Sequence, residues 1–334
     1  MKKKIWFIGG IVVLVAVVTC VIFCIGSNTH SRYINSVFVA DNDVYVAGYY
    51  LVGEDDASLD YVPVFWKNGE VQKLSDTIAN CEYNSIYVSG NDVYIAGTNR
   101  NDFSAILWKN GIAQILSGSV AGANSVYVSG NDVYVAGGIY GSATLWKNGV
   151  AQELTDNIHY GTANSVYVVG NDAYVVGYMG VTKDSTNQTV AVLWKNGIEQ
   201  CLTDGSNDAC ANAVYVSDND VYIAGEENEI AVLWKNGEVQ RLTDGKNRAK
   251  ANSVYVFGKD VYVTGENDCT HVLWKNGIKQ SLTYEKNYEG GVFETSIFVL
   301  GEDIYVHGLR SKKSFGKLSF INGFWKNGVE QKLK

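Results

Sequence analysis

The tetrapeptide Trp-Lys-Asn-Gly occurs seven times in this 334-residue chain, and its spacing constrains the fold more than any other feature. The copies begin at Trp66, Trp108, Trp146, Trp194, Trp234, Trp274 and Trp325. A mean separation of about 43 residues is typical of a repeat architecture, in which each copy is one supersecondary unit. The fold is therefore expected to contain seven equivalent units.

Each unit contains four short segments rich in Val, Ile and Tyr, a composition typical of β-strands. In the third unit these segments cover residues 124–129, 132–137, 143–146 and 150–154. Asn-Gly joins the third and fourth segments in all seven units, and this dipeptide is the strongest short-range signal for a β-hairpin. No sustained apolar period of 3.6 residues follows the N-terminal segment, so helices are not expected there. Each unit is predicted to be a four-stranded antiparallel meander.

The second predicted strand of every unit begins with an aspartate. These residues are Asp43, Asp92, Asp132, Asp172, Asp220, Asp260 and Asp303. A short carboxylate beside a turn can accept hydrogen bonds from the amides of that turn. We therefore expect each aspartate to stabilise the turn that precedes it.

Strands this apolar need cover on both faces, and sheets that stack radially provide it for one another. Propellers have about 4–8 blades, and the end units keep the apolar pattern of the internal ones, which favours a closed ring over an open solenoid. The sequence thus predicts an all-β fold, a seven-bladed β-propeller of four-stranded antiparallel blades. The first strand of each blade is expected to be innermost, and blade seven is expected to end with its own fourth strand. The predicted blades cover residues 33–81, 82–121, 122–160, 161–208, 209–248, 249–291 and 292–334.

The units also resemble known repeats. Val-Tyr-Val-Ala-Gly at residues 133–137, followed by Leu-Trp-Lys-Asn-Gly at residues 145–149, is similar to the repeat of bacterial β-propeller proteins built on a VYVAG…LWKNG pattern. A strand that ends in glycine, with a tryptophan later in the repeat, also looks like a Kelch blade, although tandem glycines follow the second strand only at residues 137–138. The resemblance covers residues 33–334 and implies the propeller fold. It implies almost nothing about activity, because propellers host many functions.

Residues 1–32 are distinct from the repeats. Lysines at positions 2–4 precede an uncharged run over residues 5–25, and these 21 residues match the roughly 20 that span a bilayer as a helix. The lysines predict a cytoplasmic N-terminus. We therefore expect a single-pass transmembrane signal-anchor that holds the propeller outside the cytoplasm. A lipoprotein modified at Cys20 or Cys24, or secretion after cleavage, is the alternative.

The repeat region is acidic. Four of the 27 basic residues precede residue 33, which leaves 23 basic residues against 35 acidic ones. That charge repels phosphate backbones, so no nucleic-acid partner is expected, and contact with a membrane is expected only through the N-terminal helix. Four cysteines lie in this region, at Cys81, Cys201, Cys210 and Cys269. They include no CxxC pair, which argues against a zinc or redox motif, and their disulfide pairing stays open, with Cys201 and Cys210 nearest in sequence.

Recognisable catalytic motifs are absent from the sequence. It contains no Gly-x-Ser-x-Gly, no phosphate-binding glycine loop and no His-Glu-x-x-His. The four histidines lack the spacing of metal ligands, and the acidic clusters lack the pattern of a calcium loop. We therefore expect neither an enzymatic activity nor a cofactor nor a metal.

Two repeated side chains have a structural and a functional interpretation. The tryptophan of the tetrapeptide either packs between blades or offers a sugar one aromatic platform per blade, and packing is favoured because Asn-Gly already forms a turn. A glutamine follows each turn glycine by three residues and is expected to bond backbone between blades. These glutamines are Gln72, Gln114, Gln152, Gln200, Gln240, Gln280 and Gln331.

Asparagine opens the innermost strand in six units. These residues are Asn35, Asn84, Asn124, Asn164, Asn212 and Asn252, and Thr295 takes the seventh place. We predict that they ring one mouth of the central channel, where they either bond to backbone and water or hold a small polar ligand. Tyr49, Tyr50 and Tyr178 follow the second strands of their blades and offer stacking surface beside amides. That combination is common in pockets for carbohydrates and other small molecules.

The segments between the second and third strands are longest in units one, four and seven. Loops on a rigid scaffold are where binding usually resides. The sequence therefore predicts a non-enzymatic binding or interaction module whose partner, an unidentified protein or glycan, meets the face that carries these loops. A multivalent lectin with one sugar site per blade is the first alternative. An enzyme with residues at the channel mouth is the second.

Overall fold

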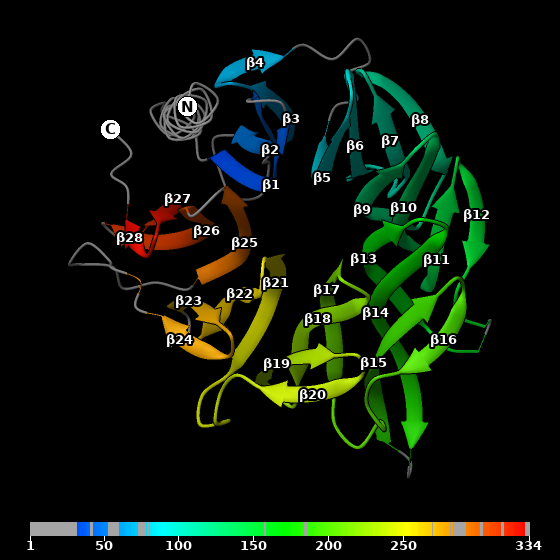
Figure 1. Ribbon diagram of the computed structural model, residues 1–334. Helices are drawn as coiled ribbons and strands as arrows, with labels where there is room; N and C mark the ends of the chain where they lie inside the picture. The colour runs from blue at the N-terminus through cyan, green and yellow to red at the C-terminus, as the bar shows by residue number, and fades with distance from the viewer. Residues whose placement is uncertain are drawn as a thin grey trace, which may run out of the picture.

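The repeats fold into a ring of seven antiparallel sheets, each with four strands (Figure 1). The computed structural model describes residues 32–40, 43–52, 60–72, 78, 80–156, 158–183, 186–268, 270–280, 282, 292–300, 303–314 and 317–330. The predicted all-β, seven-bladed propeller is thus confirmed. The predicted membrane segment lies outside the described residues, and within them no helix is long and apolar enough to cross a membrane.

The strands follow the repeats in order. Blades one to three comprise β1 (Arg32–Ala40), β2 (Asp43–Val52), β3 (Asp60–Lys67) and β4 (Glu70–Gln72); β5 (Cys81–Ser89), β6 (Asp92–Asn99), β7 (Ala105–Lys109) and β8 (Ile112–Ser117); and β9 (Ala121–Ser129), β10 (Asp132–Ile139), β11 (Ser142–Lys147) and β12 (Val150–Glu153). Blades four and five comprise β13 (Gly161–Val169), β14 (Asp172–Lys183), β15 (Thr186–Lys195) and β16 (Ile198–Cys201); and β17 (Ala209–Ser217), β18 (Asp220–Glu227), β19 (Ile230–Lys235) and β20 (Glu238–Arg241). Blades six and seven comprise β21 (Ala249–Phe257), β22 (Asp260–Asn267), β23 (Thr270–Lys275) and β24 (Ile278–Gln280); and β25 (Val292–Leu300), β26 (Asp303–Ser314), β27 (Lys317–Lys326) and β28 (Val329–Glu330).

Every blade is built from one continuous stretch of chain. The first strand of each blade lies nearest the axis of the ring and the fourth lies at its rim (Figure 1). Blade seven pairs β25, β26, β27 and β28 in that order, and β1 pairs with β2 of its own blade. The prediction that blade seven ends with its own fourth strand is therefore confirmed, and the ring closes without a shared strand.

Side chains from adjacent blades form one hydrophobic core per interface. In a typical interface Tyr134 of blade three packs in the same cluster as Trp194 of blade four. The closing interface has the same composition, because Tyr305 of blade seven packs with Val44 and Trp66 of blade one. All seven tetrapeptide tryptophans are 0–1% exposed. They lie between blades and present no platform to solvent.

The turns on one side of the ring, called here the turn face, carry a repeated polar clasp. In blade three the Asp132 carboxylate accepts hydrogen bonds from Lys147 (Nζ–Oδ2 2.8 Å) and from the Asn148 amide (2.8 Å). Lys147 also lies over the Tyr134 ring at 5.2 Å from its centroid. Asn148, at a φ of 52°, accepts the Val133 backbone N–H at 2.8 Å. The aspartate therefore binds side chains, whereas we expected it to bind turn amides.

The clasp is present in every blade. The six other copies are centred on Asp43, Asp92, Asp172, Asp220, Asp260 and Asp303. The Lys147 ammonium, together with the Asn148 amide, holds the pKa of Asp132 below its usual value. The tetrapeptide is thus fully used by the fold: Trp fills the core, Lys and Asn bind the aspartate, and Asn-Gly makes the turn.

The repeated glutamines contact the turns, but not as predicted. Gln72 and Gln280 donate to the backbone oxygens of Glu70 (3.0 Å) and Ile278 (2.8 Å), within their own hairpins. Three others lie against the turn glycine of the next blade, where a Cβ would collide with the amide. These pairs are Gln114 with Gly149, Gln152 with Gly197 and Gln240 with Gly277.

Candidate functional site

The six predicted asparagines occupy equivalent irregularities of the innermost strands. In each of these strands the pairing register shifts at the asparagine, so the residue sits in a β-bulge. Opposite the bulge stands a glycine of the second strand, such as Gly137, because the bulged backbone leaves no room for a Cβ there. In blade seven the shift falls at Glu294, one position before the Thr295 that alignment of the repeats suggested.

The asparagines link neighbouring blades. Asn124 donates its side-chain N–H to the carbonyl of Ala163 at 3.0 Å, and that alanine immediately precedes the bulged Asn164 of the next blade. Asn35, Asn84, Asn164 and Asn212 donate in the same way at 2.9–3.0 Å. The amide N–H that seemed available to a ligand is therefore used by the fold.

The serine after the asparagine makes a second bond across the same interface. Ser125 accepts the backbone N–H of Val166 at 3.3 Å, and Ser36, Ser85 and Ser165 act likewise. Blade five has Ala213 at this position and so lacks the hydroxyl. The Asn-Ser pair is a link between blades.

Five of the six asparagines line a cavity at the mouth of the channel. Its volume is about 330 Å³, and Lys250, Ser296 and His307 complete much of its wall. The asparagines that line it are Asn35, Asn84, Asn164, Asn212 and Asn252. The structure thus groups these predicted residues on one concave surface, where four of the five also donate a side-chain N–H to the backbone of the next blade.

The mouth is asymmetric in charge on the side of blades five and six. Lys250 pairs with Glu266 at 3.3 Å. Burial raises the pKa of Glu226, and burial together with Glu226 raises the pKa of the Cys210 thiol to about 12. The Cys210 thiol also lies 3.3 Å from the side-chain oxygen of Asn212. The one lysine of the cavity wall is thus neutralised by its partner.

A second recess lies on the opposite side of the ring from the turn face, above blade three. We call this side the loop face, because it carries the connections between second and third strands and between blades. The recess has a volume of about 260 Å³ and includes the sixth asparagine, Asn124. The other residues of its wall are Phe103, Val120, Ala121, Gly122, Gly138, Gly141, Gly161 and Thr162. The second and third strands of blade three are joined here by only Tyr140 and Gly141.

Large apolar side chains gather around this recess. Most hydrophobic residues of the ring are buried between blades, but five on these connections are 53–86% exposed. They are Phe103 and Val120, which line the recess, and Tyr140, Ile158 and Tyr160, which lie on the connections that lead to Gly141 and Gly161 of its wall. Exposed apolar residues that cluster together mark an interaction surface more often than single, scattered ones do. Sequence reasoning missed it, because the five residues come from four separate connections and match no motif.

The three predicted tyrosines fall in different surroundings. Tyr178 stands beside the recess, with its ring 6.5 Å from that of Tyr160. Tyr49 stacks at 4.9 Å on Tyr61, over which Arg100 lies at 5.0 Å. Tyr50 packs partly into the core between blades seven and one. The structure therefore does not gather the tyrosines and the asparagine ring into one pocket.

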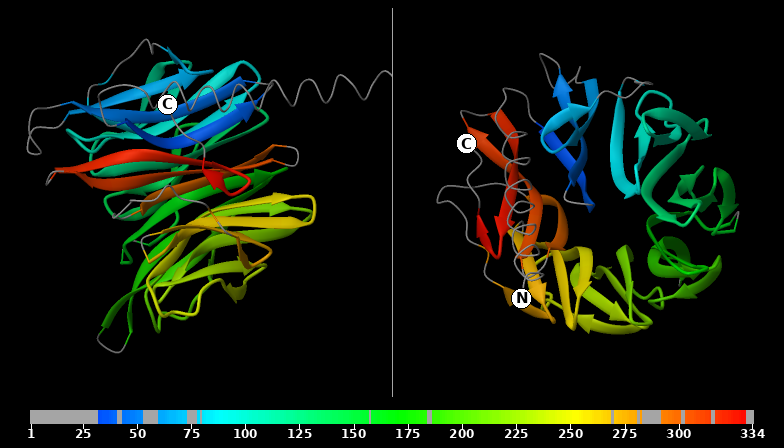
Figure 2. Two further views of the ribbon diagram at one scale, coloured as in Figure 1. Left: turned by 90° about the vertical axis from the view of Figure 1, so that its left-hand side faces the viewer. Right: turned by 45° about the horizontal axis from the view of Figure 1, so that its top comes forward.

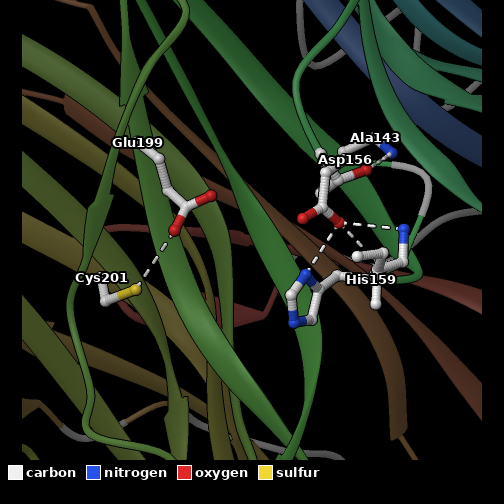
Figure 3. Close-up of polar contacts among 7 residues, drawn as sticks. Ala143, Asp156, His159, Glu199 and Cys201 are labelled. Carbon is white, nitrogen blue, oxygen red and sulfur yellow. Dashed lines mark hydrogen bonds and ion pairs between the residues drawn. The ribbon is translucent and has the colours of Figure 1, made fainter.

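The longest hairpins of the ring are β2–β3, β14–β15 and β26–β27, in blades one, four and seven. They project on the same side of the ring (Figure 2). A shorter connection, between blades three and four, holds Asp156 against His159 (Nδ1–Oδ1 2.8 Å; Figure 3). His159 lowers the pKa of that aspartate. The loop face is thus uneven, because the hairpins of blades one, four and seven are longer than those of the other blades.

No disulfide joins the described cysteines Cys81, Cys201 and Cys210 to one another. Cys201 contacts Glu199 at the outer strand of blade four (Figure 3), while Cys210 lies on the innermost strand of blade five, so the pair nearest in sequence is not bonded. Cys269 lies outside the described residues. Among those described, no three His, Cys, Asp or Glu side chains are grouped to hold a metal ion.

No protein-family model and no curated protein matches this chain. Among solved structures, the β-propeller domain of the Trilobed protease from Pyrococcus furiosus aligns with a TM-score of 0.53 at 11% identity, over 91% of this chain and 96% of that one. Pyrococcus horikoshii acylaminoacyl peptidase gives 0.53 at 14% identity over 91% of this chain, which spans about half (52%) of the peptidase. YCF48 bound to D1 peptide gives 0.54 at 13% identity, over 87% and 94%. The chain shares the β-propeller fold with these proteins, and the likeness extends to the fold alone.

Proposed function

We propose that this chain is a non-enzymatic binding module that holds a protein partner on its loop face. The observation that carries the proposal is the cluster of five exposed apolar side chains around the recess above blade three. Burying such side chains against a partner is the main source of affinity in protein interfaces. One propeller of similar fold was solved with a bound peptide, which agrees with this use of the fold.

A multivalent lectin is the weaker candidate. A sugar site in every blade needs an aromatic platform in every blade, and the repeated tryptophans are buried. An enzyme at the channel mouth is weaker still, because the cavity there is lined mainly by asparagines that bond to backbone.

The test is a pair of screens on the full chain in detergent micelles, one with a phage-displayed random peptide library and one with a glycan array. We expect peptides to be enriched and competed by one another, with one binding site per chain. Binding of glycans at several equivalent sites would replace the proposal by the lectin. The absence of enriched peptides would overturn it.

We also propose that residues 1–32 anchor the ring on the outer side of a membrane. The support is the run of apolar residues after three lysines. A reporter enzyme active only outside the cytoplasm, fused after residue 334, is expected to be active, and the chain is expected to resist extraction by alkaline carbonate. Release of the chain by carbonate, or an inactive fusion, would contradict the anchor.

A further inference from the structure

We infer that the recess above blade three binds an extended segment of the partner. One apolar side chain of that segment enters the recess, and a basic residue of the segment lies beside it. This inference rests on the proposed function and specifies where and what the loop face binds. It follows from the size of the recess, the backbone around it, the side chains on its rim and the charges beside it.

The recess suits a single side chain. Its volume of about 260 Å³ is below the roughly 300–1,000 Å³ of most sites for whole small molecules. Gly122 and Gly138 face each other across the first two strands of blade three, and Gly141 and Gly161 complete the floor. Without side chains on that floor, an extended backbone can approach closely while one of its side chains enters the recess.

The backbone around the recess adopts an unusual conformation. Phe103, Val120 and Tyr140 have positive φ, at 55°, 46° and 50°. Within the described chain, every other non-glycine residue with positive φ is Asn or Asp, except Glu229. Large and β-branched side chains are disfavoured in this region, and such residues tend to cluster at functional sites. Here Phe103 and Val120 line the recess, and Tyr140 directly precedes Gly141 of its wall.

The turn at Tyr140 shows most clearly that the local backbone conformation does not explain these large side chains. Tyr140 and Gly141 form a turn with φ values of 50° and 82°, nearly those of Asn148 and Gly149 (52° and 81°) in the same blade. Asn-Gly is the preferred pair for this turn. A tyrosine that is 70% exposed stands where asparagine fits better, and its hydroxyl lies 3.0 Å from that of Ser119. The aromatic ring is therefore available to a partner.

The charges beside the recess favour a basic flank. Asp102 is an exposed carboxylate next to Phe103, and Asp156, which also binds His159, is an exposed carboxylate on the connection that carries Ile158. Arg100, the nearby cation, is paired with Glu82. An acidic rim attracts a lysine or arginine beside the apolar anchor and repels an acidic segment.

The polar groups of the wall disfavour a sugar. Asn124 donates to Ala163, and the Thr162 hydroxyl lies 3.4 Å from that of Tyr178. Both polar side chains of the wall thus already have a partner within the chain, which leaves few groups to bond the hydroxyls of a buried sugar. An apolar side chain needs no hydrogen-bond partner in the recess.

The experiment uses the full chain in detergent micelles and, as its probe, the peptide most enriched in the phage screen. Tyr140→Asn and Val120→Asn each remove an apolar side chain and put a residue that tolerates positive φ in its place. We expect each to weaken binding of the peptide at least about tenfold, with the melting temperature unchanged or raised. Lys147→Ala, on the turn face of the same blade, is the control and is expected to bind the peptide as the parent does.

Two further results are expected. The enriched peptides share an apolar residue next to Lys or Arg, and Asp102→Asn weakens binding while making it less sensitive to salt. If Tyr140→Asn and Val120→Asn bind like the parent while Lys250→Ala does not, the channel mouth is the site; the recess is then wrong and the binding module stands. If no peptide is enriched, both proposals fail.

Discussion

The turn face and the loop face of this ring are made by the same seven repeats, yet they differ in how much the repeats diverge. On the turn face, all seven blades carry the same clasp of Asp, Lys, Asn and Tyr. On the loop face, the paired positions just before the bulges differ in each blade. These pairs are Glu82–Thr98, Gly122–Gly138, Thr162–Tyr178, Cys210–Glu226 and Lys250–Glu266. Uniformity marks what every blade needs for stability, and divergence marks where one particular partner can be recognised.

The largest effect is expected from the core that both faces share. Trp146→Ala removes a fully buried ring from the interface between blades two and three and should lower the free energy of unfolding by about 3–5 kcal/mol. Urea unfolding followed by circular dichroism measures this change. Tyr140→Asn, on the loop face of the same blade, is the matched control and should leave the free energy of unfolding unchanged or slightly raised. Equal losses in the two variants would contradict the division between core and loop face.

A smaller effect is expected from the links between blades. Asn164→Ala leaves the carbonyl of Ala211 without this donor and should lower the free energy of unfolding by about 1–3 kcal/mol.

The opposite effect is expected in blade five. Ala213→Ser there supplies the hydroxyl that four other interfaces use. It should raise the free energy of unfolding by about 0.5–1.5 kcal/mol. A destabilised Ala213→Ser would show that the serines are not links.

The smallest effect of a single change is expected on the turn face. Because the pKa of Asp132 is lower in the folded chain than its usual value, the clasp stabilises the fold above that usual value. This contribution is lost as the pH falls through the lowered pKa, below about 4. Asp132→Asn should therefore lower the melting temperature slightly at neutral pH, and by progressively less as the pH falls below about 4. The clasp is exposed, so high salt should reduce the difference. A variant that loses more stability at pH 3 than at pH 7 would reverse the assigned sign.

The sequence predicted the ring well and the loop face poorly, for one physical reason. A feature repeated seven times is visible as a period, so Trp146 and Asn148-Gly149 identify their own places in core and turn. The asparagine also recurs, but its recurrence does not show that the residue sits in a bulge. For this reason Asn124 looked free to bind a ligand, although its side-chain amide donates to Ala163. The recess was invisible because Phe103, Val120 and Tyr140 each occur once, on connections that only folding brings together.

Because each blade is a continuous piece of chain, the joint between blades seven and one has no peptide connection and splits no sheet. It also lacks the asparagine of the other joints, because Thr295 takes that place. The chain could then begin at a different blade without changing the order of the blades around the ring. A circular permutant that starts at blade four should assemble the same ring, since no split sheet has to be completed by distant ends of the chain. Duplication of a single repeat in the gene would likewise add one whole blade, and the aperture of the ring would change while every sheet stayed intact.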